Sequence, residues 1–205
     1  MLDTLSLLIS KLFYKVFPPP KQHLLEMLWS LKNEHHKNIV LNVNYKLRQY
    51  NLNDKDKYFE LLKICEMGQC PLEYWENYIL PNGFFVIEHI DSGNIVGACF
   101  ASHQSRERHK FAGNLGWLAV DPQHRGNKLG EILINAVVNR LQTAGYERIY
   151  LETHDFRLPA LKIYLNTGWV PFFYTEGMEA RWQEIYKKLN LKFDTTQFPE
   201  ISAYS

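Results

Sequence analysis

The residues best suited to chemistry lie in one stretch, Leu115–Gly130, which reads LGWLAVDPQHRGNKLG. Its first part, Leu115–Val120, is a short apolar run that ends at Asp121-Pro122, because proline cannot donate to a β-ladder and restricts the residue before it. Residues 125–130 supply two glycines and two cations before apolar residues resume at helical spacing. A strand, a glycine-containing turn and a helix N-terminus together present free backbone N–H groups to a phosphate or diphosphate.

The same spacing also fits an ordinary connection between a strand and a helix, with a solvated basic turn, because glycine-rich turns of this kind are common. The stretch has neither G-x-x-x-x-G-K-[ST] nor G-x-G-x-x-G, the two phosphate loops that spacing defines best. Elsewhere the sequence has no G-x-S-x-G, H-E-x-x-H or C-x-x-C pattern. It therefore predicts neither a serine-hydrolase elbow nor a metal site.

Two motifs carry a resemblance to a known family. Residues 123–130, QHRGNKLG, resemble the acyl-CoA signature loop of the GNAT superfamily of N-acyltransferases, in which Gln or Arg is followed by two residues, Gly, one residue, and Gly or Ala. Gln123 and Gly126 match this pattern, whereas Lys128 stands where the small residue is usual. Residues 160–169, ALKIYLNTGW, are similar to the family's A-x-x-x-Y-x-x-x-G-[FW] helix and strand. The resemblance covers about residues 45–175.

The resemblance implies an α/β fold with a mixed, mostly antiparallel central sheet, a diverging parallel pair of strands and flanking helices. It also implies transfer of an acyl group, most simply acetyl, from acetyl-CoA or another acyl-CoA to a primary amine by direct attack, with no metal. A diverging strand leaves backbone groups that need partners. The pantetheine arm of the coenzyme would supply them along Leu118, Ala119 and Val120.

By the same resemblance, the turn before the helix holds the diphosphate of the coenzyme. Its expected contacts are Arg125, Gly126, Asn127, Lys128, Leu129 and Gly130. The family often places an asparagine three residues before the alanine of the second motif, near the pantetheine. Here that residue is Arg157, which could reach a phosphate or an acidic group of the acceptor, or could serve a plain surface role.

Tyr164 is the candidate for the chemical step. Acyl transfer from a thioester to an amine needs an uncharged amine and a proton for the departing thiolate, and a phenol with a pKa of about 10 can donate throughout the neutral range. In the family, the tyrosine at this position points at the sulfur, so we expect that role here; a helix tyrosine with its hydroxyl in solvent is the alternative. The general base is less defined, and Glu152 ranks first among Glu152, His154, Asp155, Glu88 and His103.

The hydrophobic pattern predicts the elements that must position these residues. Residues 84–90 and 95–103 flank the turn sequence DSGN and form a hairpin. Arg148–Thr153 is a strand parallel to Leu115–Val120, because the crossover through the intervening helix is right-handed. The other expected elements are one or two strands over 39–50 and helices over 54–65, 71–78 and 177–189. Tyr74, Trp75 and Tyr78 would border the acceptor groove by resemblance, or belong to the core.

The N-terminal residues stand apart from this domain. Apolar residues at steps of three and four predict an amphipathic helix over Met1–Phe17, which three prolines stop, and a second apolar helix over Leu24–Leu31. The first helix lacks the features of a signal peptide and is too short to span a bilayer. Both helices would pack on the domain, form a homodimer contact, or present residues 1–31 to a membrane, a carrier protein or a long acyl chain. The predicted division is a helical N-terminal extension (1–38), a GNAT-like domain (39–192) and a tail (193–205).

Composition limits the remaining function classes. The 205 residues carry a net charge of +1 and no basic block, so nothing points to nucleic acid as a partner. Three cysteines, an odd count, favour free thiols in a reducing compartment and a cytoplasmic protein. Three alternatives stay open: a longer acyl donor, a catalytically silent acyl-CoA-binding module that engages a partner or membrane through its N-terminal helices, and a nucleotide-binding regulator.

Overall fold

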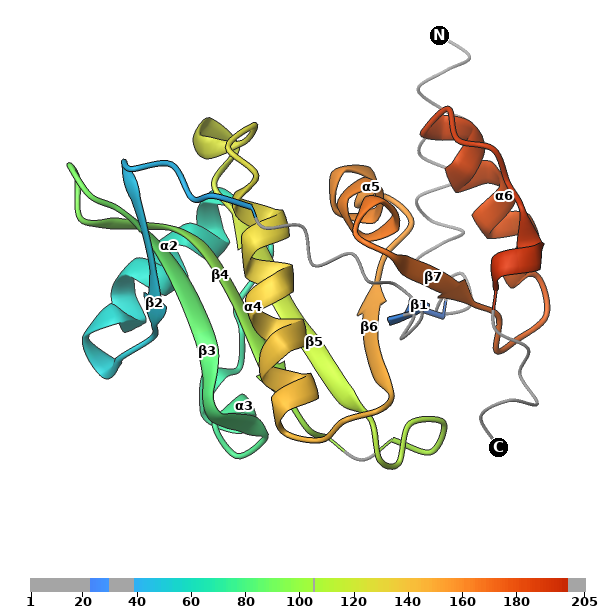
Figure 1. Cartoon of the computed structure of the whole chain (residues 1–205), viewed down its shortest axis with the longest axis horizontal. Helices are drawn as coiled ribbons and strands as arrows, with labels where there is room; N and C mark the ends of the chain where they lie inside the picture. Colours follow the sequence, from blue (N-terminus) through green and yellow to red (C-terminus); the bar gives the residue numbers. More distant parts are fainter. Residues whose placement is uncertain (1–22, 30–38, 105, 199–205) are drawn as a thin grey trace, which may run out of the picture.

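A seven-stranded mixed sheet forms the centre of the computed structural model, which describes residues 23–29, 39–104 and 106–198 (Figure 1). The strands are β1 (Leu25–Trp29), β2 (Tyr45–Gln49), β3 (Ile79–His89), β4 (Asn94–Ser102), β5 (Gly113–Val120), β6 (Ile149–Thr153) and β7 (Trp169–Phe172). The α-helices are α2 (Lys55–Ile64), α3 (Leu72–Trp75), α4 (Leu129–Thr143), α5 (Leu158–Asn166) and α6 (Met178–Lys188). Short 3₁₀ turns are η1 (Leu52–Asp54), η2 (Pro122–His124) and η3 (Thr195–Gln197).

The sheet has two halves that meet at one parallel pair of strands. The order is β2-β3-β4-β5-β6-β1-β7, and each neighbouring pair except β5 and β6 is antiparallel. β5 pairs with β6 only at Gly113↔Ile149 and Asn114↔Tyr150. Beyond Asn114 the two strands separate, which Figure 1 shows as a widening gap below α5. The predicted mixed sheet with a diverging parallel pair is therefore confirmed.

Helices cover both faces of the sheet. On one face, α4 packs Leu133 and Val137 against Val96 and Leu115 of β4 and β5. On the opposite face, α2 packs Tyr58 and Leu62 into a second cluster with alternate residues of β3 and β4, among them Val86 and Phe100. The alternation of side chains along each strand separates these two clusters. Any channel between β5 and β6 therefore joins the α4–α5 face to the α2–α3 face.

Most of the predicted elements are confirmed, with shifts of a few residues at their ends. The hairpin is β3–β4, where His89 pairs with Asn94 and Gly93 takes a φ of 65°, a conformation that glycine adopts without strain. The helix predicted over 71–78 is one turn, α3, and the strand over 39–50 is confined to β2. The first residues of the tail pack back on the domain, since the Phe193 ring lies 5.1 Å from that of Tyr186.

The prediction of a second N-terminal helix over Leu24–Leu31 is wrong for the residues that the structure describes. Residues 25–29 form β1, which lies between β6 and β7 and pairs with both. All five of its side chains are buried. A strand that is covered on both faces shows no polar alternation, and Leu, Glu and Met are good helix formers, so local pattern favoured a helix. Contacts with two distant strands decide the outcome.

The first predicted helix, Met1–Phe17, lies outside the described residues, as does Leu31. Of the helices that the structure describes, none is long and apolar enough to cross a membrane. The division at residues 38 and 193 stays a prediction, but β1 places one segment of the expected extension inside the sheet.

Candidate active site

The turn before α4 is built from two left-handed residues. Gly126 has a φ of 84° and Lys128, the residue that departs from the family pattern, has a φ of 58°. Asn127 does not line the cleft beside this turn; its side-chain amide donates to the carbonyl of His124 over 3.0 Å and so closes the turn. The first backbone hydrogen bond of α4 runs from the N–H of Ile132 to the carbonyl of Lys128, over 3.1 Å. The N–H groups of residues 129–131 therefore have no partner within the helix.

A cleft of about 500 Å³ opens beside these amides. It lies between the start of α4 and α5, and residues 65–67, which follow α2, form a third wall. Nine of the ten residues expected to bind the coenzyme line it: Leu118, Ala119, Val120, Arg125, Gly126, Lys128, Leu129, Gly130 and Arg157. A Cβ added at Gly130 would stand 3.2 Å from Ile163 of α5, so a larger residue there would crowd the cleft wall.

A second hollow, of about 290 Å³, continues from the cleft. The two share Met67, Leu118, Arg157 and Ala160. Tyr164 and Ala160 reach the second hollow from α5, whereas Trp75 reaches it from α3 on the other face of the sheet. The hollow therefore occupies the gap between β5 and β6 and connects the two faces.

A β-bulge shapes the wall of this gap. Between Ala98 and Phe100 of β4 the register on β5 steps from Ala119 to Gly116, so β5 contains an extra residue. Trp117 sits in the bulge with a φ of 55°, which is rare for a large side chain. Gly116 is needed because a Cβ there would stand 2.5 Å from the Phe100 ring. The bulge turns the backbone of residues 117–118 toward the hollow.

Tyr164 is buried in the wall of the second hollow. Its side chain is 6 % exposed, and its ring lies 6.1 Å from Trp169. Burial raises the pKa of Tyr164 far above its usual value, and the neighbouring Cys99 raises it further, while Arg157 opposes the shift. The phenol is therefore protonated at neutral pH and available as a donor. That this phenol donates a proton to a thiolate stays a prediction.

The hollow brings together some of the candidate bases and leaves others out. Glu152 and His154 line it with Tyr164. The other three candidates lie elsewhere among the described residues: Asp155 pairs with Arg181, Glu88 accepts from Arg48 over 2.7 Å, and His103 stacks on Tyr146. Of the three aromatics expected at the acceptor groove, Trp75 lines the hollow, whereas Tyr74 packs against Tyr78 with ring centroids 5.0 Å apart.

Several residues of the site carry no sequence signal of their own. Cys65, Glu66 and Met67 form one wall of the first cleft, and Phe156, which also lines it, is 74 % exposed. Burial raises the pKa of the Cys65 thiol, which keeps it protonated and a weak nucleophile. The bulge at Trp117 did have a signal, because a glycine within a strand pattern indicates a bulge or a close approach. Among the described residues, no group of three His, Cys, Asp or Glu side chains could hold a metal ion.

The fold and this cleft match a known family. The model of the "Acetyltransferase (GNAT) family" matches residues 49–169, more than half of the chain. The chain belongs to the GNAT family of acetyltransferases. An uncharacterized N-acetyltransferase from Schizosaccharomyces pombe is 30 % identical over 92 residues, which are 43 % of this chain and 52 % of the relative. The chain thus spans about half the length of that relative.

Several solved structures share the fold. A GCN5-related N-acetyltransferase from Sphaerobacter thermophilus superposes with a TM-score of 0.58 at 16 % identity, over 80 % of this chain and 53 % of that one. N-acetylglutamate synthase from Neisseria gonorrhoeae, complexed with coenzyme A and N-acetyl-glutamate, gives 0.51 at 20 % identity, over 72 % and 33 %. The NatC complex bound to Gag peptide and CoA gives 0.54 at 17 % identity, over 64 % and 87 %.

Proposed function

We propose that this GNAT protein transfers an acetyl group from acetyl-CoA to a primary amine by direct attack in a ternary complex. The single observation that carries the proposal is the continuity of the two hollows: one begins at the free amides of α4, and the next contains the buried Tyr164. A diphosphate suits the first, where Arg125 and Lys128 add positive charge to the helix N-terminus. The backbone of the bulged strand, from Leu118 to Val120, suits the amides of the pantetheine arm.

The residues of the gap supply the proton transfers that the reaction needs. Glu152 takes a proton from the ammonium, directly or through a water, and the amine nitrogen then attacks the thioester carbonyl carbon. The C–S bond breaks with its electron pair on sulfur, and Tyr164 donates its phenolic proton to that thiolate. The attacking nitrogen, which is cationic after bond formation, loses its extra proton to the phenolate, and this restores Tyr164 and leaves a neutral amide. Because the thiol of Cys65 is kept protonated by burial, an acyl-enzyme on this cysteine has no support.

The two faces of the sheet would divide the substrates between them. The coenzyme enters from the α4–α5 side, and the acceptor reaches the thioester from the α2–α3 side, where Trp75 and Glu152 line the gap. All three cysteines are free thiols, which agrees with the cytoplasmic location expected from the sequence.

Replacement of Tyr164 by Phe tests this function. Thiol release from acetyl-CoA, measured with a panel of amino acids, peptides, polyamines and aminoglycosides, should fall at least about 100-fold in kcat for Tyr164→Phe. The Kd of coenzyme A, measured by calorimetry, should stay unchanged, because the phenol is not part of the diphosphate cleft. Trp169→Phe, a change beside the same ring, is the matched control for packing. Unchanged kcat in Tyr164→Phe would remove this residue from the mechanism.

A further inference from the structure

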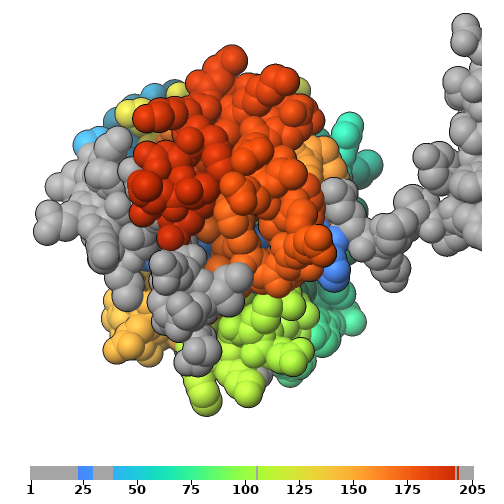
Figure 2. Space-filling model, turned by 90° about the vertical axis from the view of Figure 1, so that its right-hand side faces the viewer, coloured from blue at the N-terminus to red at the C-terminus, as the bar shows by residue number. Residues whose placement is uncertain are grey.

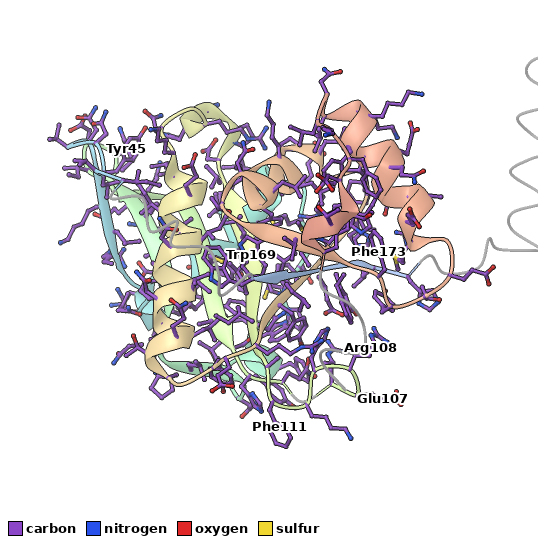
Figure 3. All side chains as sticks on the ribbon, turned by 45° about the vertical axis from the view of Figure 1, so that its right-hand side comes forward. Tyr45, Glu107, Arg108, Phe111, Trp169 and Phe173 are labelled. Atoms are coloured by element: carbon purple, nitrogen blue, oxygen red, sulfur yellow. The ribbon has the colours of Figure 1, made fainter. Side chains whose placement is uncertain are left out.

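A small charged pocket lies next to the acceptor side of the gap. It has a volume of about 160 Å³ and is lined by Glu26, Arg106, Glu107, Arg108, His109 and Glu152. Glu152 lines both this pocket and the hollow that contains Tyr164, so the two spaces adjoin. Figure 3 shows Glu107 and Arg108 on the loop between β4 and β5, far from Tyr45 at the other end of the molecule.

Most of the charges in this pocket are already paired. Glu26, 1 % exposed, accepts from Arg108 over 2.5 Å and from His109 over 2.8 Å. Arg148 donates to Nδ1 of His109 over 3.1 Å, so the other ring nitrogen, Nε2, carries the hydrogen that faces Glu26. Arg108 also lies over the Tyr174 ring, 4.0 Å from its centre. These contacts fix Arg108 and His109 in place.

Arg106 is held far less tightly. It approaches Glu152 to 3.6 Å, which is beyond hydrogen-bonding distance, and it shares a side-chain hydrogen bond with Tyr150. A guanidinium has five N–H donors in a planar fork that fits a carboxylate. Arg106 therefore has donors that no carboxylate of the described residues takes up, and they lie beside the one carboxylate, Glu152, that faces the reaction gap.

An amine that approaches Glu152 as an ammonium competes with Arg106 for that carboxylate. If the acceptor carries a carboxylate of its own, Arg106 gains a new partner as it gives up Glu152, and every charge stays compensated. In an α-amino acid a single carbon joins the ammonium to the carboxylate, which matches the short separation between Glu152 and Arg106. The pocket is also small enough to favour a free amino acid over a chain.

We propose that Arg106 is the specificity-determining residue for an acceptor that carries a carboxylate next to its amine, namely a free α-amino acid. The acceptor's carboxylate pairs with Arg106 while its amine lies between Glu152 and the thioester. This inference rests on the proposed acetyl transfer, and it adds the chemical class of the acceptor.

The test compares each amino acid with its carboxamide, which keeps the amine and removes the negative charge. With acetyl-CoA and the full chain, kcat/KM for the preferred amino acid should exceed that for its amide by about 10- to 100-fold. In Arg106→Gln the ratio of the two kcat/KM values should fall to about one, with a higher KM for the amino acid, while KM for acetyl-CoA stays the same. Arg106→Lys should keep part of the preference, because it keeps the charge but not the fork.

Lys110→Gln is the matched control, since it removes one positive charge from the same loop at a residue that does not line the pocket. It should leave the preference intact. Thermal unfolding of each variant verifies that the fold survives. Equal use of acid and amide by the unmodified protein, or a preference that survives Arg106→Gln, overturns this inference and leaves acetyl transfer standing. Absence of thiol release with every amine overturns the proposed function and the inference with it.

Discussion

A buried carboxylate accepts hydrogen bonds in each half of the sheet, Asp54 in one and Glu26 in the other. The two differ in the sequence separation between the carboxylate and its partners. In the β2–β5 half, Asp54 accepts from two nitrogens of Arg48, at 2.6 and 2.8 Å, across six residues of sequence. In the other half, Glu26 of β1 accepts from Arg108 and His109, across 82 and 83 residues. One link forms within a local segment, whereas the other forms only when β1 docks between β6 and β7.

The exposure of the two links differs as well. Arg48 is 21 % exposed and also binds Glu88, so it keeps a partner when Asp54 is lost. Glu26 and His109 are each 1 % exposed in their side chains. The outer surface on that side is formed mainly by the chain around α5, β7 and α6, with the β4–β5 loop below it (Figure 2). The half formed by β6, β1 and β7 therefore depends on one buried set of contacts between residues far apart in the sequence.

The largest expected effect is on stability. Glu26→Gln removes the charge that Arg108 and His109 face; because Glu26 is 1 % exposed but Arg108 is 46 % exposed, the loss should be about 2–3 kcal/mol, as for hydrogen bonds to a charged group. Asp54→Asn should cost about 1–2 kcal/mol, because Arg48 retains Glu88 and is partly solvated. Urea unfolding of both variants at neutral pH measures the difference. If Asp54→Asn lowered the free energy of unfolding as much as Glu26→Gln or more, the half formed by β6, β1 and β7 would not be the one that depends more on its buried carboxylate.

A pH dependence should follow from the same carboxylate. Burial by itself raises the pKa of Glu26, but hydrogen bonds from His109 and Arg108 outweigh it, and the pKa lies below its ordinary value of 4.5. A lowered pKa in the folded state means that the stabilisation is complete above about pH 4.5 and is lost as the pH falls through the folded value. The free energy of unfolding should therefore differ between wild type and Glu26→Gln by a constant amount down to roughly pH 5.

Below that pH the difference should shrink, because the wild-type carboxylate becomes protonated and the glutamine does not titrate. Urea titrations at several pH values between neutral and roughly pH 3 give the curve. Asp54→Asn, whose parent carboxyl also has a pKa lowered by Arg48, is the control for titration in the other half. A gap that widens on acidification would mean that the pKa of Glu26 is raised in the fold.

The smallest expected effect concerns the turn before α4. Lys128 adopts a left-handed conformation, which glycine tolerates better than a residue with a Cβ by about 1 kcal/mol. Lys128→Gly should therefore be more stable than Lys128→Ala by about 1 kcal/mol. Both variants lose the same cation, so both should bind coenzyme A about 2- to 5-fold more weakly. A similar stability for the two variants would mean that the turn carries no strain at this residue.

The halves also differ in how much of them the sequence predicts. The β3–β4 hairpin, β5, the turn and α4 are consecutive along the chain, and local turn chemistry and hydrophobic spacing are sufficient to predict them. The two motifs lie at adjoining hollows, the turn before α4 at the first and Tyr164 at the second. Here local and global preferences agree.

The other half has no such local signal. Residues 25–29 read as part of a helix because a strand buried on both faces lacks alternation, and its partners lie more than 100 residues away. The loop residues Arg106, Arg108 and His109 look like an ordinary charged surface in the sequence. Only the docking of β1 brings Glu26 against them, so neither their pairing nor the pocket they form could be predicted from spacing.

The position of bound coenzyme A, determined by crystallography of the full chain, tests the site most directly. We expect the diphosphate oxygens within hydrogen-bonding distance of the main-chain amides of residues 126–130, and the sulfur beside the hydroxyl of Tyr164. A diphosphate bound elsewhere while this turn faces solvent, or a sulfur remote from Tyr164, would contradict the proposed site.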